Sequence, residues 1–289
     1  MRAACADVVD RAQLVRINEE RLGSLASTLA AADMDAPERL SVEYAVTFNA
    51  VNFGSGWHPH LDKEPGASGS VTMMTRLRRR FDEAGPFSAS DLAALTVSDC
   101  AQLFGQRLRP PVDELMTLFA RSLNDLGRFL LDRFDGSFDA LVAAADGSAA
   151  VLVELLQDMP MYRDVASYGG ITVPFLKRAQ LTASDIGTFG DLGRLTLFAD
   201  NLIPHVLRVE GVLSLDRGLA EAIDAGELLE PGGPAEVELR AAAVVLGDRL
   251  AAVADGAMTP AEVDNRLWRR GQDARFKAVP RPRIRTSFY

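Results

Sequence analysis

The stretch that decides the fold class reads "DELMTLFARSLNDLGRFLLDRF" and spans residues 113–134. Apolar side chains recur in it at steps of three and four residues, at Leu115, Leu118, Phe119, Leu123, Leu126, Phe129 and Leu130. Because an α-helix makes one turn in about 3.6 residues, this spacing places these side chains along one face. The stretch therefore predicts an amphipathic helix.

The same periodicity extends over most of the chain. "ELRAAAVVLGDRLAAVADG" at residues 238–256 has it again and ends on a glycine suited to a C-cap. About a dozen such stretches are joined by short linkers of Gly, Pro and Asp. Thr96 with Asp99 and Thr259 with Glu262 have the spacing of capping boxes, which mark helix starts. Strand alternation is scarce, so the sequence predicts an all-α fold.

Length and composition limit the kind of protein. A chain of 289 residues is near the upper end of what one hydrophobic core supports, and we expect a single domain over residues 1–289. Hydrophobic residues make up 48% and charged residues 25%, a balance typical of a soluble globular protein. The net charge of -9 argues against a surface that binds long nucleic acids, although a local basic cluster could still hold a small anion.

The cysteines and the N-terminal sequence indicate a cytoplasmic protein. Cys5 and Cys100 are far apart in sequence, so neither a disulfide framework nor a cysteine zinc site is expected. The first twenty residues lack the apolar run of a signal peptide, and no later stretch reaches the about 20 apolar residues of a membrane span. We therefore expect no membrane association.

A metal site is not expected either. "WHPH" places His58 two residues before His60, a spacing that can bind zinc. A third ligand is missing, because His205 is the only other histidine and neither cysteine has a neighbouring ligand.

The segment "LTLFADNLIPHVLRVEG" at residues 195–211 contains the most suggestive acid. If it forms one helix, that helix is buried on most of its circumference with the carboxylate of Asp200 inside it. Pro204 has no N–H for the carbonyl of Asp200, so the helix should kink or open there. Two interpretations remain evenly balanced: Asp200 is a working acid with a perturbed environment, or it is a structural acid that caps a helix or bridges a neighbour.

Two further segments combine polar groups with helical spacing. "VPFLKRAQLTASDI" predicts a helix from Pro174, on which Lys177 and Arg178 could clamp a phosphate or could simply face solvent. In "VDNRLWRRGQ", Asp264 and Trp268 lie four residues apart, so the indole can lie beside the carboxylate and bind a flat heterocycle. The alternative is a core tryptophan with Asp264 near a helix start.

The C-terminal tail places three arginines, Arg281, Arg283 and Arg285, at alternate positions. An extended segment would carry them on one side, where they could grip an anion or tie the terminus to acidic surface.

Several of these segments together resemble a known family. In order, "VPFLKRAQLTASDI", "LTLFADNLIPHVLRVEGVL" and "VDNRLWRRGQ…PRPRIRTSFY" are similar to blocks of the queuosine salvage proteins, the queuosine 5′-phosphate N-glycosylases, and "VTFNAVNFGSGW" is a weaker match. The similarity covers about half the chain. Its order and spacing make it more specific than any single block.

The resemblance implies a fold, a reaction and a set of residues. The fold would be akin to helical base-excision glycosylases, and the reaction would be hydrolysis of the N-glycosidic bond of queuosine 5′-phosphate, which releases queuine for tRNA modification. No cofactor, metal or direct nucleic-acid partner is implied. Asp200 matches the catalytic aspartate, and Lys177, which matches a lysine of the "KRAQ" block, is the second implied catalytic residue. The implied substrate-binding residues are Phe198, Ala199, Asn201, Asp264, Asn265, Trp268, Asn52, Trp57, His58, Arg178 and Arg208.

Departures from the family pattern motivate an alternative of a different class. Asn49 stands where relatives commonly have Asp, and Asn201 and Asn265 stand where an aromatic residue is common. A module that binds the nucleotide or the base without hydrolysing it is therefore the alternative. A base-excision protein acting on DNA or RNA is a third hypothesis, which the acidic balance opposes.

Overall fold

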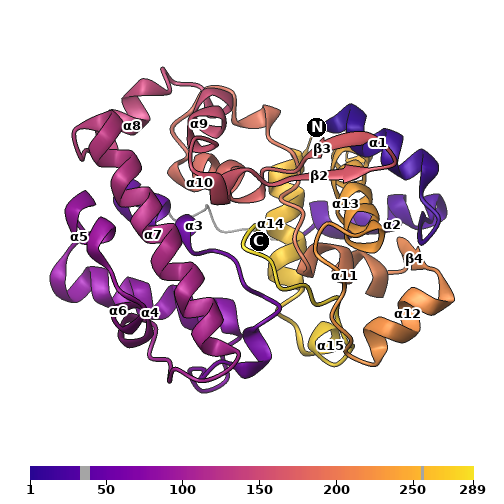
Figure 1. The fold of residues 1–289 in the computed structure, drawn as a ribbon. Coiled ribbons are helices and arrows are strands. Elements are labelled where there is room, and N and C mark those ends of the chain that lie inside the picture. The colour runs from indigo at the N-terminus through magenta and orange to yellow at the C-terminus, as the bar shows by residue number, and fades with distance from the viewer. Residues whose placement is uncertain (33–39, 255–256) are drawn as a thin grey trace. The chain divides into compact units, whose positions relative to one another are not determined.

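The computed structural model describes residues 1–32, 40–254 and 257–289. Within these ranges it contains fifteen α-helices and four short strands (Figure 1). The prediction of a mainly helical fold is confirmed, and the strands form two small antiparallel pairs that the sequence did not predict. The chain divides into two compact units.

Unit 1 comprises residues 1–38, 164–177 and 193–284, of which 33–38 and 255–256 lie outside the described ranges. Its helices are α1 (Arg2–Arg11), α2 (Leu22–Ala30), α11 (Leu202–Val209), α12 (Arg217–Asp224), α13 (Pro234–Val253), α14 (Pro260–Arg270) and α15 (Ala274–Lys277). Its strands are β1 (Val15–Ile17), β2 (Val165–Tyr168), β3 (Ile171–Pro174) and β4 (Leu213–Leu215).

The core of unit 1 is built around α13. This helix is buried over most of its length and packs against α1, α2, α11 and α14, which are labelled in Figure 1, and against β1. Gly247 allows a close approach on α13, because a Cβ at this position would come within 2.6 Å of Leu197 Cβ. α13 confirms the helix predicted from residue 238, whereas the predicted cap at Gly256 lies outside the described residues. Leu197, in the segment before α11, lies directly against this helix.

Two strand pairs complete unit 1. β2 and β3 form a hairpin whose two loop residues, Gly169 and Gly170, both have positive φ, 52° and 83°. A two-residue hairpin loop needs this conformation, which glycine adopts without steric cost. β1 pairs antiparallel with β4. The Glu238 carboxylate of α13 accepts hydrogen bonds from the backbone N–H groups of residues 13–15, at the start of β1. It also accepts one from the Tyr168 hydroxyl of β2 at 2.7 Å.

The helix predicted for residues 195–211 is wrong in its bounds. Residues 195–201 are not helical, and α11 begins at Leu202. Pro204 therefore lies in the first turn, where its missing N–H would have no helical partner anyway. The predicted opening of the helix at Asp200 is confirmed, but it takes the form of a helix start instead of a kink.

Unit 2 comprises residues 39–163, 178–192 and 285–289, of which residue 39 lies outside the described ranges. Its helices are α3 (Val42–Ala50), α4 (Gly69–Ala84), α5 (Ala89–Ala94), α6 (Val97–Leu103), α7 (Val112–Phe134), α8 (Phe138–Ala144) and α9 (Ala149–Leu156), with most of α10 (Lys177–Ile186). The long helix α7 confirms the one predicted at residues 113–134 and contacts α3, α5, α6 and α8.

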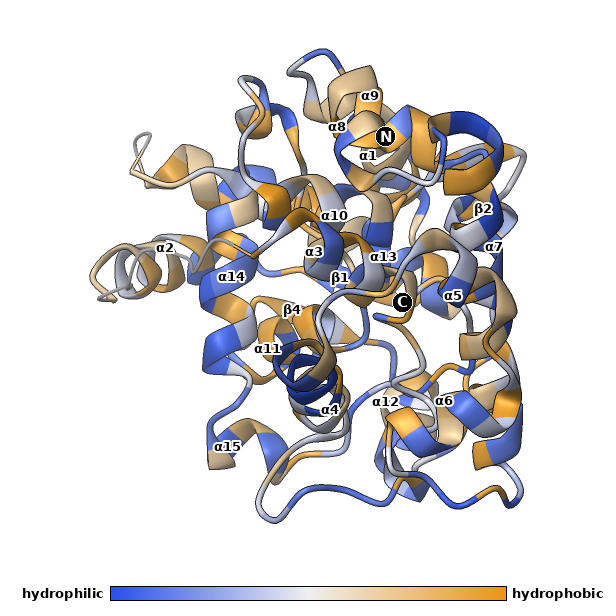
Figure 2. Ribbon diagram, turned by 90° about the vertical axis from the view of Figure 1, so that its left-hand side faces the viewer, coloured by the Kyte–Doolittle hydropathy of each residue, from blue (hydrophilic) through white to orange (hydrophobic). Residues whose placement is uncertain are grey.

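Local signals of the sequence explain how several of these helices begin. The capping boxes at Thr96 and Thr259 are both formed, and they start α6 and α14. By contrast, α10 begins at Lys177 and not at Pro174, because Pro174 ends β3 and Leu176 adopts a positive φ of 52°. In Figure 2, α4 is mostly blue, in keeping with its run of arginines at residues 76 and 78–80.

Among the described residues, none of the helices combines the length and the apolar character needed to cross a bilayer.

Candidate active site around Asp200

Asp200 precedes α11 and is fixed by the start of that helix. Its Oδ1 accepts hydrogen bonds from the backbone N–H groups of Leu202 at 2.7 Å and Ile203 at 3.0 Å. The first N–H groups of a helix have no partner within it, so the carboxylate satisfies two of them. The second oxygen, Oδ2, makes no hydrogen bond with another residue of the described ranges, and the side chain is half-buried. One oxygen is thus held in place while the other is available to a ligand.

The guanidinium of Arg281 interacts electrostatically with the Asp200 carboxylate. Burial lowers the pKa of Arg281, and the negative charge of Asp200 acts in the opposite direction. The arginine stays charged at any physiological pH. Its positive charge is therefore attracted to the Asp200 carboxylate.

Two side chains from other helices hold the segment before α11. Asp264 Oδ1 of α14 accepts the N–H of Phe198 at 3.0 Å. Arg240 Nε of α13 donates to the carbonyl of Ala199 at 3.0 Å. Since these bonds fix the two residues directly before Asp200, they fix the position of its Cα.

Arg240 is itself held in a buried ionic cluster. Its Nη1 and Nη2 donate to the two carboxylate oxygens of Asp164 at 2.8 and 2.5 Å, and its guanidinium lies 4.0 Å from the centroid of the Phe175 ring. Asp164 Oδ2 also accepts the backbone N–H of Lys177 at 3.1 Å. The side chains of Arg240 and Asp164 are 3% and 4% exposed. A continuous set of hydrogen bonds therefore connects Lys177 to Ala199.

The predicted residues of unit 1 are not all brought together. Asp264 contacts the Asp200 segment directly, and Lys177 is connected to it through the cluster. Trp268 is half-buried and packs against the core of unit 1. Arg208 lies at the opposite end of α11, where it donates to Asp224 Oδ1 at 2.9 Å. The structure does not bring Arg208 to Asp200.

The structural alternative for Asp200 has support as well. The carboxylate caps α11, which is the role that the sequence left open as a structural interpretation. Capping uses only Oδ1, however. The two interpretations are therefore compatible, since a cap that fixes one oxygen also orients the other.

The histidine of α11 serves packing. His205 is buried, and its Nε2 lies 2.9 Å from the carbonyl oxygen of Phe276. Burial lowers the pKa of His205, which favours the neutral imidazole, while the hydrogen bond to Phe276 acts in the opposite direction. Its Nδ1 has no hydrogen-bond partner among the described residues.

The predicted residues of unit 2 make contacts of their own. Trp57 is buried, and its Nε1 donates to Glu114 Oε2 at 2.9 Å. Asn52 donates to Asn49 Oδ1 at 3.0 Å, and Asn49 in turn donates to Asp185 Oδ2 at 2.7 Å. The amide of Asn49 thus pairs with a carboxylate, which an aspartate at this position would repel.

The basic residues of α10 are buried and do not form a solvated face. Lys177, Arg178 and Gln180 are 5%, 1% and 3% exposed, so the solvent-facing alternative for this helix is wrong. Arg178 donates to the backbone carbonyls of Ala50, at 2.6 Å, and Met161. These bonds give it a structural role within unit 2.

Sequence reasoning missed Arg240 and Asp164. Arg240 lies in the apolar run "VELRAAAVV", and a charged residue at that place in a buried helix is a signal for an internal ion pair. The partner has no comparable signal, because Asp164 lies 76 residues away in a loop.

Residues 1–32, 40–254 and 257–289 contain no group of three or more His, Cys, Asp or Glu side chains placed to hold a metal ion.

The fold and the site define a class of protein. A mainly helical chain with a helix-capped carboxylate, one oxygen of which is available, is suited to stabilise positive charge that develops on a bound ligand, as glycoside-cleaving enzymes do. The chain belongs to the family of queuosine salvage proteins, whose profile matches residues 32–289.

Individual relatives agree with this membership. The chain is 34% identical to the queuosine 5′-phosphate N-glycosylase/hydrolase of Sphaerobacter thermophilus, in a match that covers 98% of this chain and 95% of that protein. It is 32% identical to the protein of the same name from Bos taurus, over 77% of this chain and 72% of that one. For the protein of that name from Dictyostelium discoideum the identity is 31%, over 70% and 66%. The resemblance inferred from the sequence blocks is confirmed.

Proposed function

We propose that this chain hydrolyses the N-glycosidic bond of queuosine 5′-phosphate and releases the base queuine for reuse in tRNA modification. The observation that carries the proposal is the carboxylate of Asp200, which the start of α11 fixes through Oδ1 and which leaves Oδ2 to a ligand. The relatives from Sphaerobacter thermophilus and Bos taurus are named as enzymes of this activity. No cofactor is part of the proposal.

The chemistry follows from the charge that the reaction creates. Cleavage of the bond between the sugar and the base develops positive charge on the anomeric carbon. Asp200 Oδ2 stabilises this charge or directs a water to the same carbon from the side opposite the base. The water gives its hydroxyl to the sugar, its proton goes to the departing base, and ribose 5-phosphate and queuine result.

The departing base needs help of a particular kind. A 7-deazaguanine has carbon at the position of purine N7, so protonation at that atom does not assist departure. We assign recognition of the base to Asp264, which binds the backbone N–H of Phe198, and to Asn265 and Trp268, which follow it on α14. Asn201, which directly precedes α11, completes the group from unit 1.

Positive charge for the 5′-phosphate comes from Arg281 and Lys177 in this proposal. Arg281 interacts with the Asp200 carboxylate, and Lys177 is connected to the same segment by the Asp164–Arg240 cluster. We give Arg208 no role at the phosphate, because it is paired with Asp224 at the other end of α11. For Asn52, Trp57, His58 and Arg178, the predicted substrate-binding roles rest on the family resemblance of their sequence blocks alone.

Substitution of Asp200 tests the proposal. The purified chain is incubated with queuosine 5′-phosphate, and free queuine is quantified by chromatography. We expect release by the wild type and at least a hundredfold lower kcat for Asp200→Asn. Its thermal midpoint should change little, because asparagine caps helices about as well as aspartate.

The controls separate catalysis from folding. Asp224→Asn changes an exposed carboxylate of unit 1 that pairs with Arg208, and it should leave kcat unchanged within about twofold. Absence of queuine release by the wild type, or full activity of Asp200→Asn, would overturn the proposal. Tight binding of the nucleotide without turnover would instead support the alternative of a non-catalytic binding module.

Three finer assignments belong to the same proposal. We infer that the protein acts in the cytoplasm, which its two widely spaced cysteines support. We propose that residues 1–289 act as one domain related in fold to the helical base-excision glycosylases. A direct nucleic-acid or membrane partner is not proposed, in line with the net charge of -9.

A further inference from the structure

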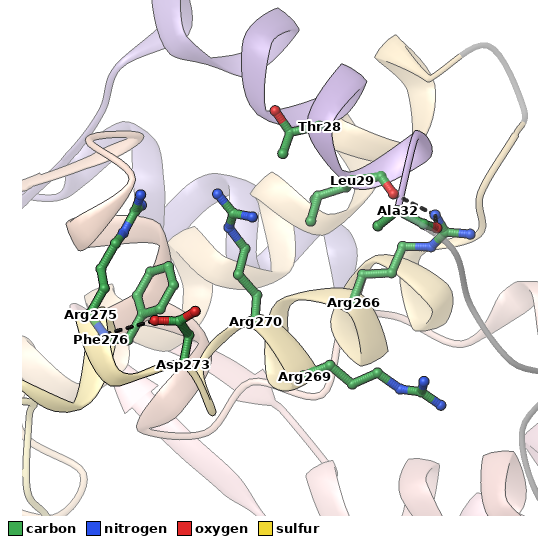
Figure 3. Close-up of a pocket in the computed structure, with 9 residues that line it drawn as sticks. All are labelled: Thr28, Leu29, Ala32, Arg266, Arg269, Arg270, Asp273, Arg275 and Phe276. Atoms are coloured by element: carbon green, nitrogen blue, oxygen red, sulfur yellow. Dashed lines mark hydrogen bonds between the residues drawn. The ribbon is translucent and has the colours of Figure 1, made fainter.

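A cavity in unit 1 is lined by arginines from one helix and the turn that follows it. Its volume is about 330 Å³, and Figure 3 shows its lining residues. Arg266, Arg269 and Arg270 come from α14, at positions i, i+3 and i+4, so they emerge from one face of that helix. Arg275 comes from α15. Leu29 of α2 is part of the apolar lining.

The charges around this cavity do not cancel. Arg270 and Arg275 both pair with Glu210 Oε1, at 2.5 and 2.6 Å, and Asp273 also lines the cavity. Four guanidiniums therefore face two carboxylates, a local excess of two positive charges on a chain whose net charge is -9. Such an excess in a recess concentrates small anions.

Several donors of these arginines remain unused. Arg269 is exposed and makes no ion pair or hydrogen bond with another described residue. Arg266 Nη1 donates to backbone carbonyls at the end of α2, whereas its buried Nε–H finds no acceptor among the described residues. A buried donor without an acceptor is unfavourable, and this one belongs to a side chain that lines the cavity.

The cavity also has an aromatic wall. In Figure 3 the ring of Phe276 lies between the side chains of Arg275 and Arg270, and the guanidinium carbons lie 4.7 and 5.8 Å from its centroid. These contacts hold the two guanidiniums in place beside the cavity. The volume exceeds that of one inorganic phosphate, so a phosphate attached to a small organic group would fill the space better.

We propose that this cavity is a second binding site, which takes a small phosphate-bearing anion and is separate from the site at Asp200. Guanidinium groups suit phosphate because their N–H donors match two of its oxygens at once. Separation follows from α11, since Asp200 precedes its first residue while Glu210, which holds Arg270 and Arg275, follows its last. Eight helical residues span about 12 Å, which is longer than a ribose 5-phosphate. The proposal does not rest on the proposed enzymatic activity.

Calorimetric titration of the full chain tests the site. The probes are ribose 5-phosphate, inorganic phosphate and ribose, at low ionic strength with chloride as the only other anion. We expect a component of ribose 5-phosphate binding that Arg269→Ala weakens about tenfold and Arg269→Glu abolishes, because one charge-assisted contact is lost in the first and repulsion replaces it in the second. Ribose should not bind there.

Two further variants keep the test independent of Arg269. Thr28→Glu places a carboxylate at the opposite wall of the cavity and should abolish the same component. Arg217→Ala removes an exposed arginine of α12 elsewhere in unit 1 and should preserve it. Inorganic phosphate binding as tightly as ribose 5-phosphate would identify free phosphate as the ligand, and weaker binding would identify a phosphate ester.

The kinetics of hydrolysis distinguish this site from the site at Asp200. Arg269→Glu should leave the KM and kcat for queuosine 5′-phosphate unchanged within about twofold. A tenfold rise in KM would mean that the cavity holds the substrate phosphate, and the separate site would be refuted. Equal binding of all probes by wild type, Arg269→Glu and Thr28→Glu would refute any anion site here, whether or not the chain hydrolyses the nucleotide.

Discussion

The ion pair of Arg240 with Asp164 leads to the sharpest prediction, for the variant Arg240→Met. Methionine keeps much of the volume of the side chain and removes its charge and all its donors. The carboxylate of Asp164 would then be left in a buried position with the backbone N–H of Lys177 as a remaining donor, and the carbonyl of Ala199 would lose the donor that fixes it.

The magnitude follows from burial. With side-chain exposures of 3% and 4%, solvent screens the pair little, and removal of one partner from such a pair costs about 3–5 kcal/mol of unfolding free energy. At roughly 2–4 °C per kcal/mol for a chain of this size, the thermal midpoint should fall by on the order of 10 °C. The kcat for queuosine 5′-phosphate should fall more than KM rises, because the displaced Ala199 directly precedes Asp200.

The assay is urea unfolding followed by circular dichroism, alongside steady-state kinetics. Arg217→Met is the matched control, because Arg217 also forms an ion pair but is 90% exposed, and its loss should cost less than about 0.5 kcal/mol. The double variant Asp164→Asn with Arg240→Met no longer leaves the Asp164 carboxylate buried without its partner, although Glu236 still loses Arg240, so the double variant should be more stable than Arg240→Met alone. Arg240→Lys, which keeps the charge and loses the forked geometry, covers the case in which Arg240→Met fails to fold.

Two outcomes would refute the reasoning. An Arg240→Met protein that unfolds within about 1 kcal/mol of wild type would show that the pair contributes nothing net. A folded Arg240→Lys or Arg240→Met protein with unchanged kcat would show that the bond to Ala199 does not position Asp200.

Three other predictions concern ionisable groups. Burial lowers the pKa of His205 below its ordinary 6.5, so at mildly acidic pH the unfolded chain binds a proton that the folded chain does not. The free energy of unfolding should therefore fall as the pH drops below about 6.5. If the free energy of unfolding of His205→Gln falls with pH as steeply as that of the wild type, the prediction is contradicted. Burial raises the pKa of Cys5 to about 11 and that of Cys100 to about 12, so neither thiol should react with a thiol reagent at pH 8 before the chain unfolds, and rapid native labelling would be inconsistent with the structure. Burial raises the pKa of Tyr168 to about 12, so its hydroxyl stays protonated and donates to Glu238. Tyr168→Phe removes this hydrogen bond and should lower the free energy of unfolding in urea by about 2 kcal/mol. An unchanged urea midpoint would show that the bond is not stabilising.

The fold class was predictable because it depends on local periodicity. The apolar positions of residues 113–134 and the caps at Thr96 and Thr259 are signals that lie within one or two helical turns, and the structure contains all three features. The hairpin of β2 and β3 was missed because its strands have only four residues each, too few for a clear alternation. The start of α10 was misplaced for a related reason, since Pro174 suits the end of a strand as well as the start of a helix.

The parts of the candidate site that depend on neighbouring residues in the sequence were predictable, whereas its contacts between distant residues were not. Asp200 stood out as an acid in an apolar segment, and Pro204 correctly indicated an interruption of the helix there. Nothing within a few residues of Asp200 indicates that Arg240 and Asp264 bind the two preceding residues, because these partners lie 41 and 66 positions away from the residues they hold. Such contacts are decided by packing, which periodicity does not encode.

The division of the chain has a consequence for its synthesis. Unit 1 is assembled from three separate stretches, and Glu238 binds backbone groups 223–225 residues earlier in the chain. During translation the first stretch therefore emerges long before its partners, while residues 39–163 of unit 2 form one continuous run. We expect a ribosome-bound chain to be protected from proteases first in α7 and its neighbours, and α1 to stay sensitive until α13 has emerged. Early protection of α1 in stalled chains would contradict this order.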